Sequence, residues 1–180
     1  MVTEGGSDRG DARAVPAVAK ASAATKPIVV ERLTHQDVNE ITALYRRVWE
    51  AFHGELPPEL VKAWQPTPLE FTSWMEGVTY FAARRDGKMI GAIGCEITDA
   101  SCRLVHLAVD AESRRQGVAT ALTTAAVEWA RHNNSQSVWA DALARFTAAG
   151  QVFRRLGFTE CGVLHKHYWA EDVRLFEKIL

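Results

Sequence analysis

A short basic loop ahead of an amphipathic helix is the feature that most limits what this sequence can fold into. Residues 102–109 form an apolar run of strand length, and after residue 117 the apolar residues recur at the spacing of one helix face. The loop between them reads Arg114-Arg115-Gln116-Gly117-Val118-Ala119. A helix N-terminus attracts anions through its unpaired N–H groups, and a glycine there lets a bulky phosphate approach the backbone. The stretch therefore predicts a pyrophosphate-binding loop.

Two widespread phosphate-binding loops do not match this stretch. A Walker A loop needs Lys-Ser or Lys-Thr after its last glycine, and a Rossmann turn needs three spaced glycines. Residues 114–120 contain neither. The pattern that fits is Arg/Gln-x-x-Gly-x-Gly/Ala. In this respect the chain resembles the GCN5-related N-acetyltransferases (the GNAT superfamily), whose coenzyme A pyrophosphate loop has this form.

A second stretch lies at the distance expected in that superfamily. In the family, the helix after the fifth strand carries the signature Asn-x-x-Ala-x-x-x-Tyr-x-x-x-Gly-Phe. Ala149 and Gly157-Phe158 match it here, whereas Phe146 stands at the Asn position and Phe153 at the Tyr position. The two motifs together support the resemblance, and the two phenylalanines are departures that concern catalysis.

The predicted order of elements is that of the same fold. Apolar periodicities predict an α/β protein with a mixed central sheet, in the order β-α-α-β-β-β-α-β-α-β-β, and helices on both faces. Local signals mark several boundaries: a capping box from Thr67 to Glu70, a hairpin turn at Asp86-Gly87 and a left-handed helix end at Asn133-Asn134. The resemblance therefore extends over roughly residues 28–180.

Composition narrows the partners and the compartment. The 21 Lys and Arg residues against 22 Asp and Glu give a net charge of −1, so neither nucleic acid nor a membrane is expected as a partner. Cys95, Cys102 and Cys161 lie in apolar runs and are predicted to be core thiols, with no disulfide and no metal site. Residues 1–26 predict a disordered tail without a signal peptide, followed by one domain at residues 27–180. A cytoplasmic monomer or homodimer is expected.

The resemblance implies acetyl coenzyme A (acetyl-CoA) as the acyl donor. In the family, the fourth and fifth strands splay apart, and the pantetheine arm lies between them like an added strand. Backbone groups of Leu107, Ala108 and Val109 would hold that arm, and one backbone N–H would polarise the thioester carbonyl. The residues assigned to the pyrophosphate are Arg114, Arg115, Gln116, Gly117, Val118, Ala119 and Thr120. Phe146 and Phe153 occupy the two signature positions beside the cofactor, but Phe153 has no proton to give to the departing thiolate.

The base that takes the amine proton is harder to assign. Family members often have Glu early in the fourth strand, where this chain has Arg103, which cannot accept a proton. Others use a carboxylate in the fifth strand, and that position is Asp141. Asp141 is therefore the candidate catalytic residue, acting through a water because its side chain is short. The alternative is a structural role in which Asp141 caps the turn after its strand.

Several other titratable side chains lie near the expected site. Strand alternation predicts that His106 points to the opposite face from Val105 and Leu107, as a packed core histidine. The remaining candidates are His53, predicted to end a helix; His165 and His167, predicted at the surface; and Glu96, facing either the acceptor or solvent.

Transfer of an acetyl group to a primary amine, by direct attack in a ternary complex, is the leading expectation. A lysine amine (pKa ~10.4) is neutral in only about one molecule in a few thousand at pH 7, whereas an α-amine (pKa ~7.8) is neutral in roughly one in seven. The poor supply of bases favours an acceptor of lower amine pKa, while small amines, amino acids, peptide N-termini and protein lysines all stay open. A catalytically weak acyl-CoA-binding sensor or interaction domain is the alternative, and transfer of a longer acyl group is a third hypothesis.

Overall fold

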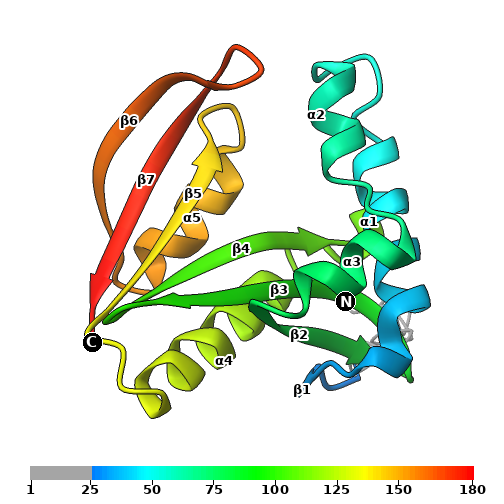
Figure 1. The fold of residues 1–180 in the computed structure, drawn as a ribbon, viewed down its shortest axis with the longest axis horizontal. Helices are drawn as coiled ribbons and strands as arrows, with labels where there is room; N and C mark the ends of the chain where they lie inside the picture. The colour runs from blue at the N-terminus through cyan, green and yellow to red at the C-terminus, as the bar shows by residue number, and fades with distance from the viewer. Residues whose placement is uncertain (1–25) are drawn as a thin grey trace, which may run out of the picture.

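A seven-stranded mixed sheet organises residues 26–180, the part of the chain that this computed structural model describes (Figure 1). Apart from Lys26, the predicted tail at residues 1–26 lies outside the described residues. The strand order is β1-β2-β3-β4-β5-β7-β6, and among these strands only β4 and β5 pair in parallel. The α/β fold class, the mixed sheet and the seven strands agree with the prediction.

The elements in chain order are β1 (Val29–Arg32), the 3-10 turn η1 (His35–Asp37), α1 (Val38–Glu50), α2 (Pro58–Ala63), α3 (Pro68–Trp74), β2 (Val78–Arg85), β3 (Lys88–Thr98), β4 (Ser101–Val109), the 3-10 turn η2 (Ala111–Ser113), α4 (Val118–His132), β5 (Ser137–Leu143), α5 (Thr147–Arg155), β6 (Thr159–Tyr168) and β7 (Glu171–Ile179).

Three helices, one more than the predicted order contained, follow β1. The third begins where the sequence signal lies, because the Thr67 backbone N–H donates to Glu70 at 2.8 Å and the Thr67 hydroxyl accepts from the Glu70 N–H. The other local signals are also confirmed. Asp86 and Gly87 turn the β2–β3 hairpin with φ values of 53° and 75°, and Asn134 has the left-handed φ of 61° after α4.

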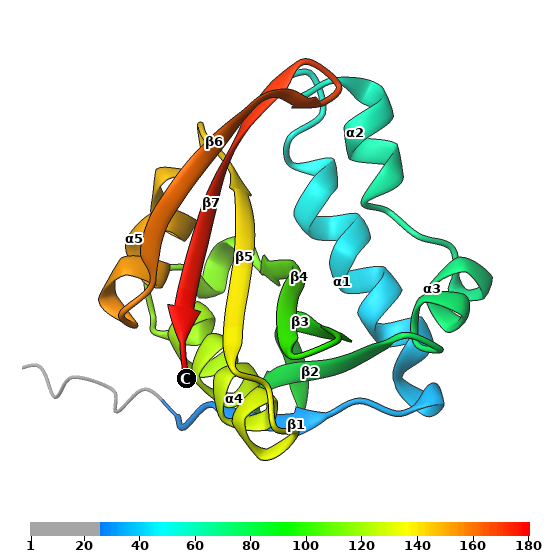
Figure 2. The same cartoon turned by 60° about the vertical axis from the view of Figure 1, so that its left-hand side comes forward.

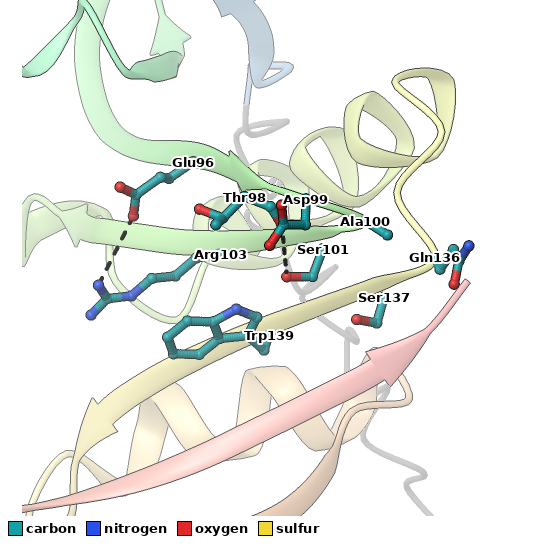
Figure 3. A pocket seen from close by; sticks show the side chains of 9 residues that line it. All are labelled: Glu96, Thr98, Asp99, Ala100, Ser101, Arg103, Gln136, Ser137 and Trp139. Carbon is teal, nitrogen blue, oxygen red and sulfur yellow. Dashed lines mark hydrogen bonds and ion pairs between the residues drawn. The ribbon is translucent and has the colours of Figure 1, made fainter.

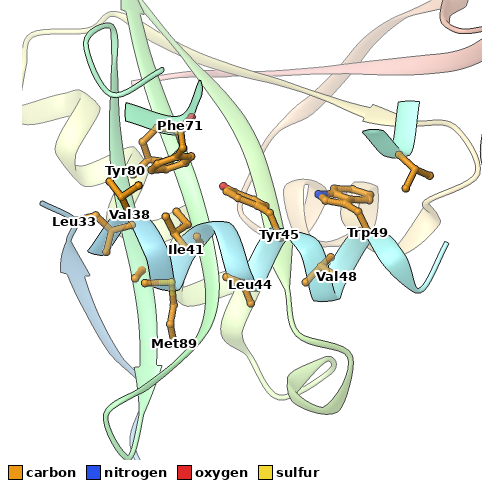
Figure 4. Packing of buried hydrophobic residues seen from close by; sticks show 14 of the residues in the cluster. Leu33, Val38, Ile41, Leu44, Tyr45, Val48, Trp49, Phe71, Tyr80 and Met89 are labelled. Carbon is orange, nitrogen blue, oxygen red and sulfur yellow. The ribbon is translucent and has the colours of Figure 1, made fainter. Parts of the chain in front are cut away.

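Two hydrophobic cores lie on opposite faces of the sheet. The first core packs α1, α2 and α3 against the sheet, with Tyr45, Phe71 and Tyr80 among its fully buried side chains (Figure 4). The second core packs α4 and α5 against the other face, around residues such as Leu122 and Phe176. Helices therefore cover both faces, as predicted. Within residues 26–180, no helix is long and apolar enough to cross a membrane.

The three cysteines do not share one environment. Cys95 and Cys102 are buried in the second core, as predicted, and are free thiols. Cys161 is exposed, so the prediction of a core thiol there is wrong. The reason is topological: β6 lies at the edge of the sheet, and most of its residues face solvent.

Candidate functional site

The parallel strands β4 and β5 pair only over their first residues and then diverge (Figure 2). Hydrogen-bonded pairing runs from Ser101 opposite Ser137 to Leu104 opposite Ala140. Beyond that point, Ala108 and Val109 stay paired with β3 on one side only, while β5 continues beside β7. The β4 backbone that the sequence analysis assigned to the pantetheine arm therefore has no strand on its β5 side, and the expected splaying is confirmed.

A β-bulge interrupts β4 at the start of this divergence. The register with β3 shifts between Ala92 and Gly94, and His106 adopts a left-handed φ of 55°. The extra residue places the His106 ring on the same face as Val105, since both approach Tyr80, whose hydroxyl lies 2.7 Å from Nδ1 of His106. The prediction that His106 points away from Val105 is wrong, because simple alternation fails at a bulge.

His106 is enclosed by aromatic side chains. The Tyr45 hydroxyl donates to the His106 carbonyl at 2.9 Å, and the Trp74 ring stacks on the imidazole at 4.5 Å between centroids. Burial, aided by the charge of Arg103 and partly opposed by that of Asp141, lowers the pKa of His106 from 6.5 to about 4. The ring is therefore neutral near pH 7. Burial also raises the pKa of the Tyr80 hydroxyl, so this hydroxyl keeps its proton, and the tautomer of the ring sets which partner donates.

The predicted phosphate loop joins β4 to α4. Gly117 is the N-cap of α4 with φ 83°, and no side chain caps the first turn. A Cβ built on Gly117 would have no heavy atom within 4 Å, so open space lies in front of the loop. Arg114 and Arg115 are both exposed beside it. An uncapped helix N-terminus with room in front and two arginines at its side suits a diphosphate, so the loop fits the predicted ligand.

Side chains from neighbouring elements fix this loop. Arg85, at the end of β2, donates to the Gln116 side-chain oxygen at 2.5 Å, and the Gln116 amide nitrogen donates to the Glu112 carbonyl at 2.7 Å. Gln116 therefore serves the loop through its side chain. Arg85 was not among the predicted site residues, since it lies about thirty positions from the loop in the sequence, and it adds a third positive charge there.

An aromatic group from the end of α1 and the start of α5 lies at the same end of the divergence as this loop. Phe146, at the start of α5, lies 5.0 Å from the Phe52 ring and 6.3 Å from the Trp49 ring. The Arg114 guanidinium lies 5.5 Å from the Phe52 ring, and its Nε donates to the Val109 carbonyl at 3.2 Å. The structure thus brings together the predicted residues Val109, Arg114 and Phe146. Phe52, which joins them, was not among the predicted site residues.

Phe153 does not join this group. Its side chain is 2% exposed, and its ring packs against Phe158 and Phe176 in the second core. A ring this buried offers almost no surface to a bound molecule, and the cofactor contact of Phe153 stays a prediction. The cause of the burial is the amphipathic pattern of α5, which turns Phe153 and Gly150 inward.

Asp141 lies at the point where β4 and β5 part, because it directly follows the last paired residue, Ala140. Its Oδ1 accepts from Nη2 of Arg103 at 2.9 Å, and its Oδ2 accepts from the Tyr168 hydroxyl at 3.1 Å. The Arg103 guanidinium also lies 4.8 Å from the Trp139 ring. The Asp141 side chain is 15% exposed. The carboxylate is therefore held by partners from β4 and β6, neither of which was predicted as a site residue.

An open depression of about 450 Å³ adjoins this cluster through Arg103 (Figure 3). Figure 3 shows Glu96 and Arg103 pointing toward each other from adjacent strands, with Trp139 beside them on β5. The depression is lined by Glu96, Thr98, Asp99, Ala100, Ser101, Arg103, Gln136, Ser137 and Trp139. The depression is thus lined by polar groups from three strands and by the Trp139 ring, and Arg103 connects it to Asp141.

The remaining candidate residues lie away from the divergence or at the surface. His53, His165 and His167 are exposed, which agrees with the surface placement predicted for the last two. His165 lies 3.2 Å from a carboxylate oxygen of Asp172 in the β6–β7 hairpin. Within residues 26–180, no three His, Cys, Asp or Glu side chains gather closely enough to hold a metal ion.

Comparison with known proteins decides the family. A model of the acetyltransferase (GNAT) family matches residues 40–158. The chain belongs to the GNAT acetyltransferase family. That match runs from α1 to the start of β6 and so includes the diverging strands, the phosphate loop and α5, the elements from which the GNAT resemblance was inferred.

Two curated human proteins are similar to this GNAT chain. N-acetyltransferase 8B and N-acetyltransferase 8 of Homo sapiens are 31% and 30% identical to it over 105 residues. The match covers 55% of this chain and 46% of each relative, so the chain spans about half the length of the curated relatives it matches.

Solved structures share the GNAT fold over most of the described residues. The ribosomal-protein-alanine N-acetyltransferase from Brucella melitensis has a TM-score of 0.70 at 22% identity, covering 84% of this chain and 99% of that one. The paia N-acetyltransferase from Thermoplasma acidophilum, solved in complex with coenzyme A, has a TM-score of 0.69 at 15% identity, covering 86% and 99%. At these identities the likeness shows the fold alone.

Proposed function

We propose that this GNAT protein is an acetyl-CoA-dependent N-acetyltransferase that acts on a primary amine by direct attack in a ternary complex. The observation that carries the proposal is the opening between β4 and β5. It runs from the uncapped N-terminus of α4, beside Arg114 and Arg115, to the carboxylate of Asp141. The candidate phosphate-binding groups follow β4 and the candidate proton acceptor lies on β5, so both adjoin the same divergence.

Each part of the opening has a separate task. The first-turn N–H groups of α4 and the arginines around them would hold the pyrophosphate, and the one-sided β4 backbone at residues 107–109 would hold the pantetheine amides. When bound, acetyl-CoA supplies a thioester that the acceptor amine attacks, so that a C–N bond forms, the C–S bond breaks and coenzyme A leaves. Asp141 takes the proton that the amine loses, directly or through one water, and solvent protonates the thiolate.

The acceptor that suits this site best is an amine with a pKa near that of a peptide N-terminus. Asp141 already accepts hydrogen bonds from Arg103 and Tyr168, and no second carboxylate approaches it among the partners that the described residues provide. A single shared carboxylate serves an α-amine more readily than a lysine, because far more of the α-amine is neutral at pH 7.

An acceptor screen tests the proposal. Purified protein is incubated with acetyl-CoA and with peptides bearing a free N-terminus, N-blocked lysine peptides or small amines, and products are read by mass spectrometry. We expect acetylation of α-amines before lysines. Asp141→Asn should lower kcat/KM about a hundredfold at pH 7, and the loss should shrink at pH 9, where more acceptor is already neutral. Asp86→Asn, in the distant β2–β3 turn, is the matched control.

A catalytically weak acyl-CoA-binding sensor is the second candidate function. Two observations favour it: the position of the family tyrosine holds the buried Phe153, and the candidate base is tied to an arginine. Calorimetry with coenzyme A and acetyl-CoA distinguishes the two functions. Tight binding with no acetylated product from any acceptor class would support the sensor and reject the enzyme.

A further inference from the structure

Arg103 occupies an unusual place for an arginine, early in β4 and between two strand neighbours. It lies directly opposite Glu96 on β3 and Trp139 on β5 in the sheet register. Its guanidinium stacks near the Trp139 ring at 4.8 Å, and Nη1 lies 4.0 Å from a Glu96 carboxylate oxygen. The side chain is 31% exposed. The contacts with Trp139 and Glu96 therefore fix the plane of the guanidinium independently of its hydrogen bond to Asp141.

The fixed guanidinium aims one nitrogen at two partners. Nη2 of Arg103 donates to Oδ1 of Asp141 at 2.9 Å and to the Tyr168 hydroxyl oxygen at 3.1 Å, and that hydroxyl donates in turn to Oδ2 of Asp141. The three side chains come from β4, β5 and β6 and form a closed set of hydrogen bonds. Burial and the charge of Asp141 raise the pKa of Tyr168, so its hydroxyl stays a donor.

These hydrogen bonds orient the Asp141 carboxylate without occupying all of its acceptor positions. An ionised carboxylate has about four acceptor positions on its two oxygens, and Arg103 and Tyr168 occupy one on each oxygen. Each oxygen keeps one acceptor position for the proton of an incoming amine or a bridging water. A carboxylate held by two donors also loses its rotational freedom about the side-chain bonds, which fixes where its unoccupied acceptor positions point.

We infer that Arg103 is a positioning residue for the transfer, acting through Asp141, with the Tyr168 hydroxyl as its second support. The inference rests on the proposed N-acetyltransferase function. In the step concerned, the amine nitrogen bonds to the acetyl carbon, the C–S bond breaks, the amine proton passes to Asp141, and the thiolate takes a proton from solvent. Arg103 neither gains nor loses a proton; it holds the carboxylate in place.

A merely structural tie between strands would behave differently. Arg103 and Asp141 join β4 to β5 next to their last backbone pair, so a structural role would appear as lower stability or weaker coenzyme A binding. A positioning role appears in kcat for the acceptor reaction, and only while Asp141 is present. Residues that act as one catalytic unit give losses that do not add.

The test is a double-mutant cycle with a conservative rescue. Arg103→Met, Arg103→Lys and Tyr168→Phe are measured alone and in the Asp141→Asn background, with kcat, KM, coenzyme A affinity and melting temperature for each. We expect Arg103→Met to lower kcat about tenfold or more, Arg103→Lys to recover part of that loss, and neither to add to the Asp141→Asn defect. Arg131→Met, which removes an exposed ion pair with Glu128 on α4, is the matched control.

Each outcome of the double-mutant cycle either supports or overturns the inference about Arg103. A loss in kcat that vanishes in the Asp141→Asn background, with coenzyme A affinity and melting temperature kept, supports the inference. An equal fold-decrease in kcat in both backgrounds, or a loss confined to stability, overturns the inference while leaving the proposed acetyltransferase function in place. If Arg103→Met fails to fold, Tyr168→Phe alone carries the same cycle. A parent protein without turnover on any amine overturns both the inference and the proposed function.

Discussion

Acidification should destabilise this protein through His106, whose enclosed ring binds a proton only with difficulty. The unfolded chain takes up that proton near pH 6.5, and the folded chain only near pH 4. Between these values the unfolded state holds more protons, so the free energy of unfolding rises with pH and falls on acidification. At 1.36 kcal/mol per pH unit, the loss between pH 6.5 and pH 4 comes to roughly 3 kcal/mol.

The perturbation that isolates this contribution is His106→Asn. Asparagine tolerates the left-handed backbone at this position, can form a hydrogen bond with the Tyr80 hydroxyl as donor or acceptor, and does not titrate. The free energy of unfolding is measured by urea titration at pH 7, 6, 5 and 4 for parent and variant. Other acidic groups titrate in both proteins, so the difference between the two curves reports His106.

We expect the advantage of the parent over His106→Asn to shrink by roughly 3 kcal/mol between pH 7 and pH 4. The exposed His53→Asn is the matched control and should change nothing in this window. Parallel curves for parent and His106→Asn would refute the reasoning, because they would mean that the folded protein protonates His106 as easily as the unfolded chain does.

Three further predictions concern the cofactor loop and α5. Gly117→Val should weaken coenzyme A binding about tenfold, or roughly 1.4 kcal/mol. The control Gly87→Val has a similarly positive φ and equally open space, and it should lower stability without changing coenzyme A affinity. Equal coenzyme A affinities of the two variants by calorimetry would contradict this prediction. Arg85→Met should weaken coenzyme A binding by about fivefold because it frees the loop and removes a charge, and Arg85→Lys should weaken it less. Phe153→Tyr should lower the free energy of unfolding by about 1–3 kcal/mol, because its hydroxyl would be buried without a partner; a stable variant with a faster rate would instead restore the family role of the tyrosine.

Local signals in the sequence were sufficient for much of the fold. The capping box at Thr67, the turn at Asp86-Gly87 and the helix end at Asn134 each depend on a few neighbouring residues, and all three are present. The phosphate loop belongs to the same class, since a glycine between a strand and a helix sets its backbone directly. The structure of such contiguous motifs can be predicted without knowing the tertiary contacts.

Contacts between distant residues explain the rest. The bulge at His106 arises from mismatched pairing with β3, which no periodicity within β4 records. The Arg103–Asp141–Tyr168 set joins residues 38 and 27 positions apart, and the sequence pattern contains no sign that an arginine would hold the candidate base. The family position of Phe153 suggested a cofactor contact, whereas the inward face of its helix buries the ring.

The brief pairing of β4 with β5 also has consequences for how the molecule opens and folds. Strands β1 to β4 form one set and β5, β6 and β7 form another, and within each set all the strand pairs are antiparallel. Only four parallel residue pairs join the two sets, and they must wait for α4 to cross between them. Amide hydrogens on either side of this seam should therefore exchange together during partial opening, earlier than those in the centre of either set.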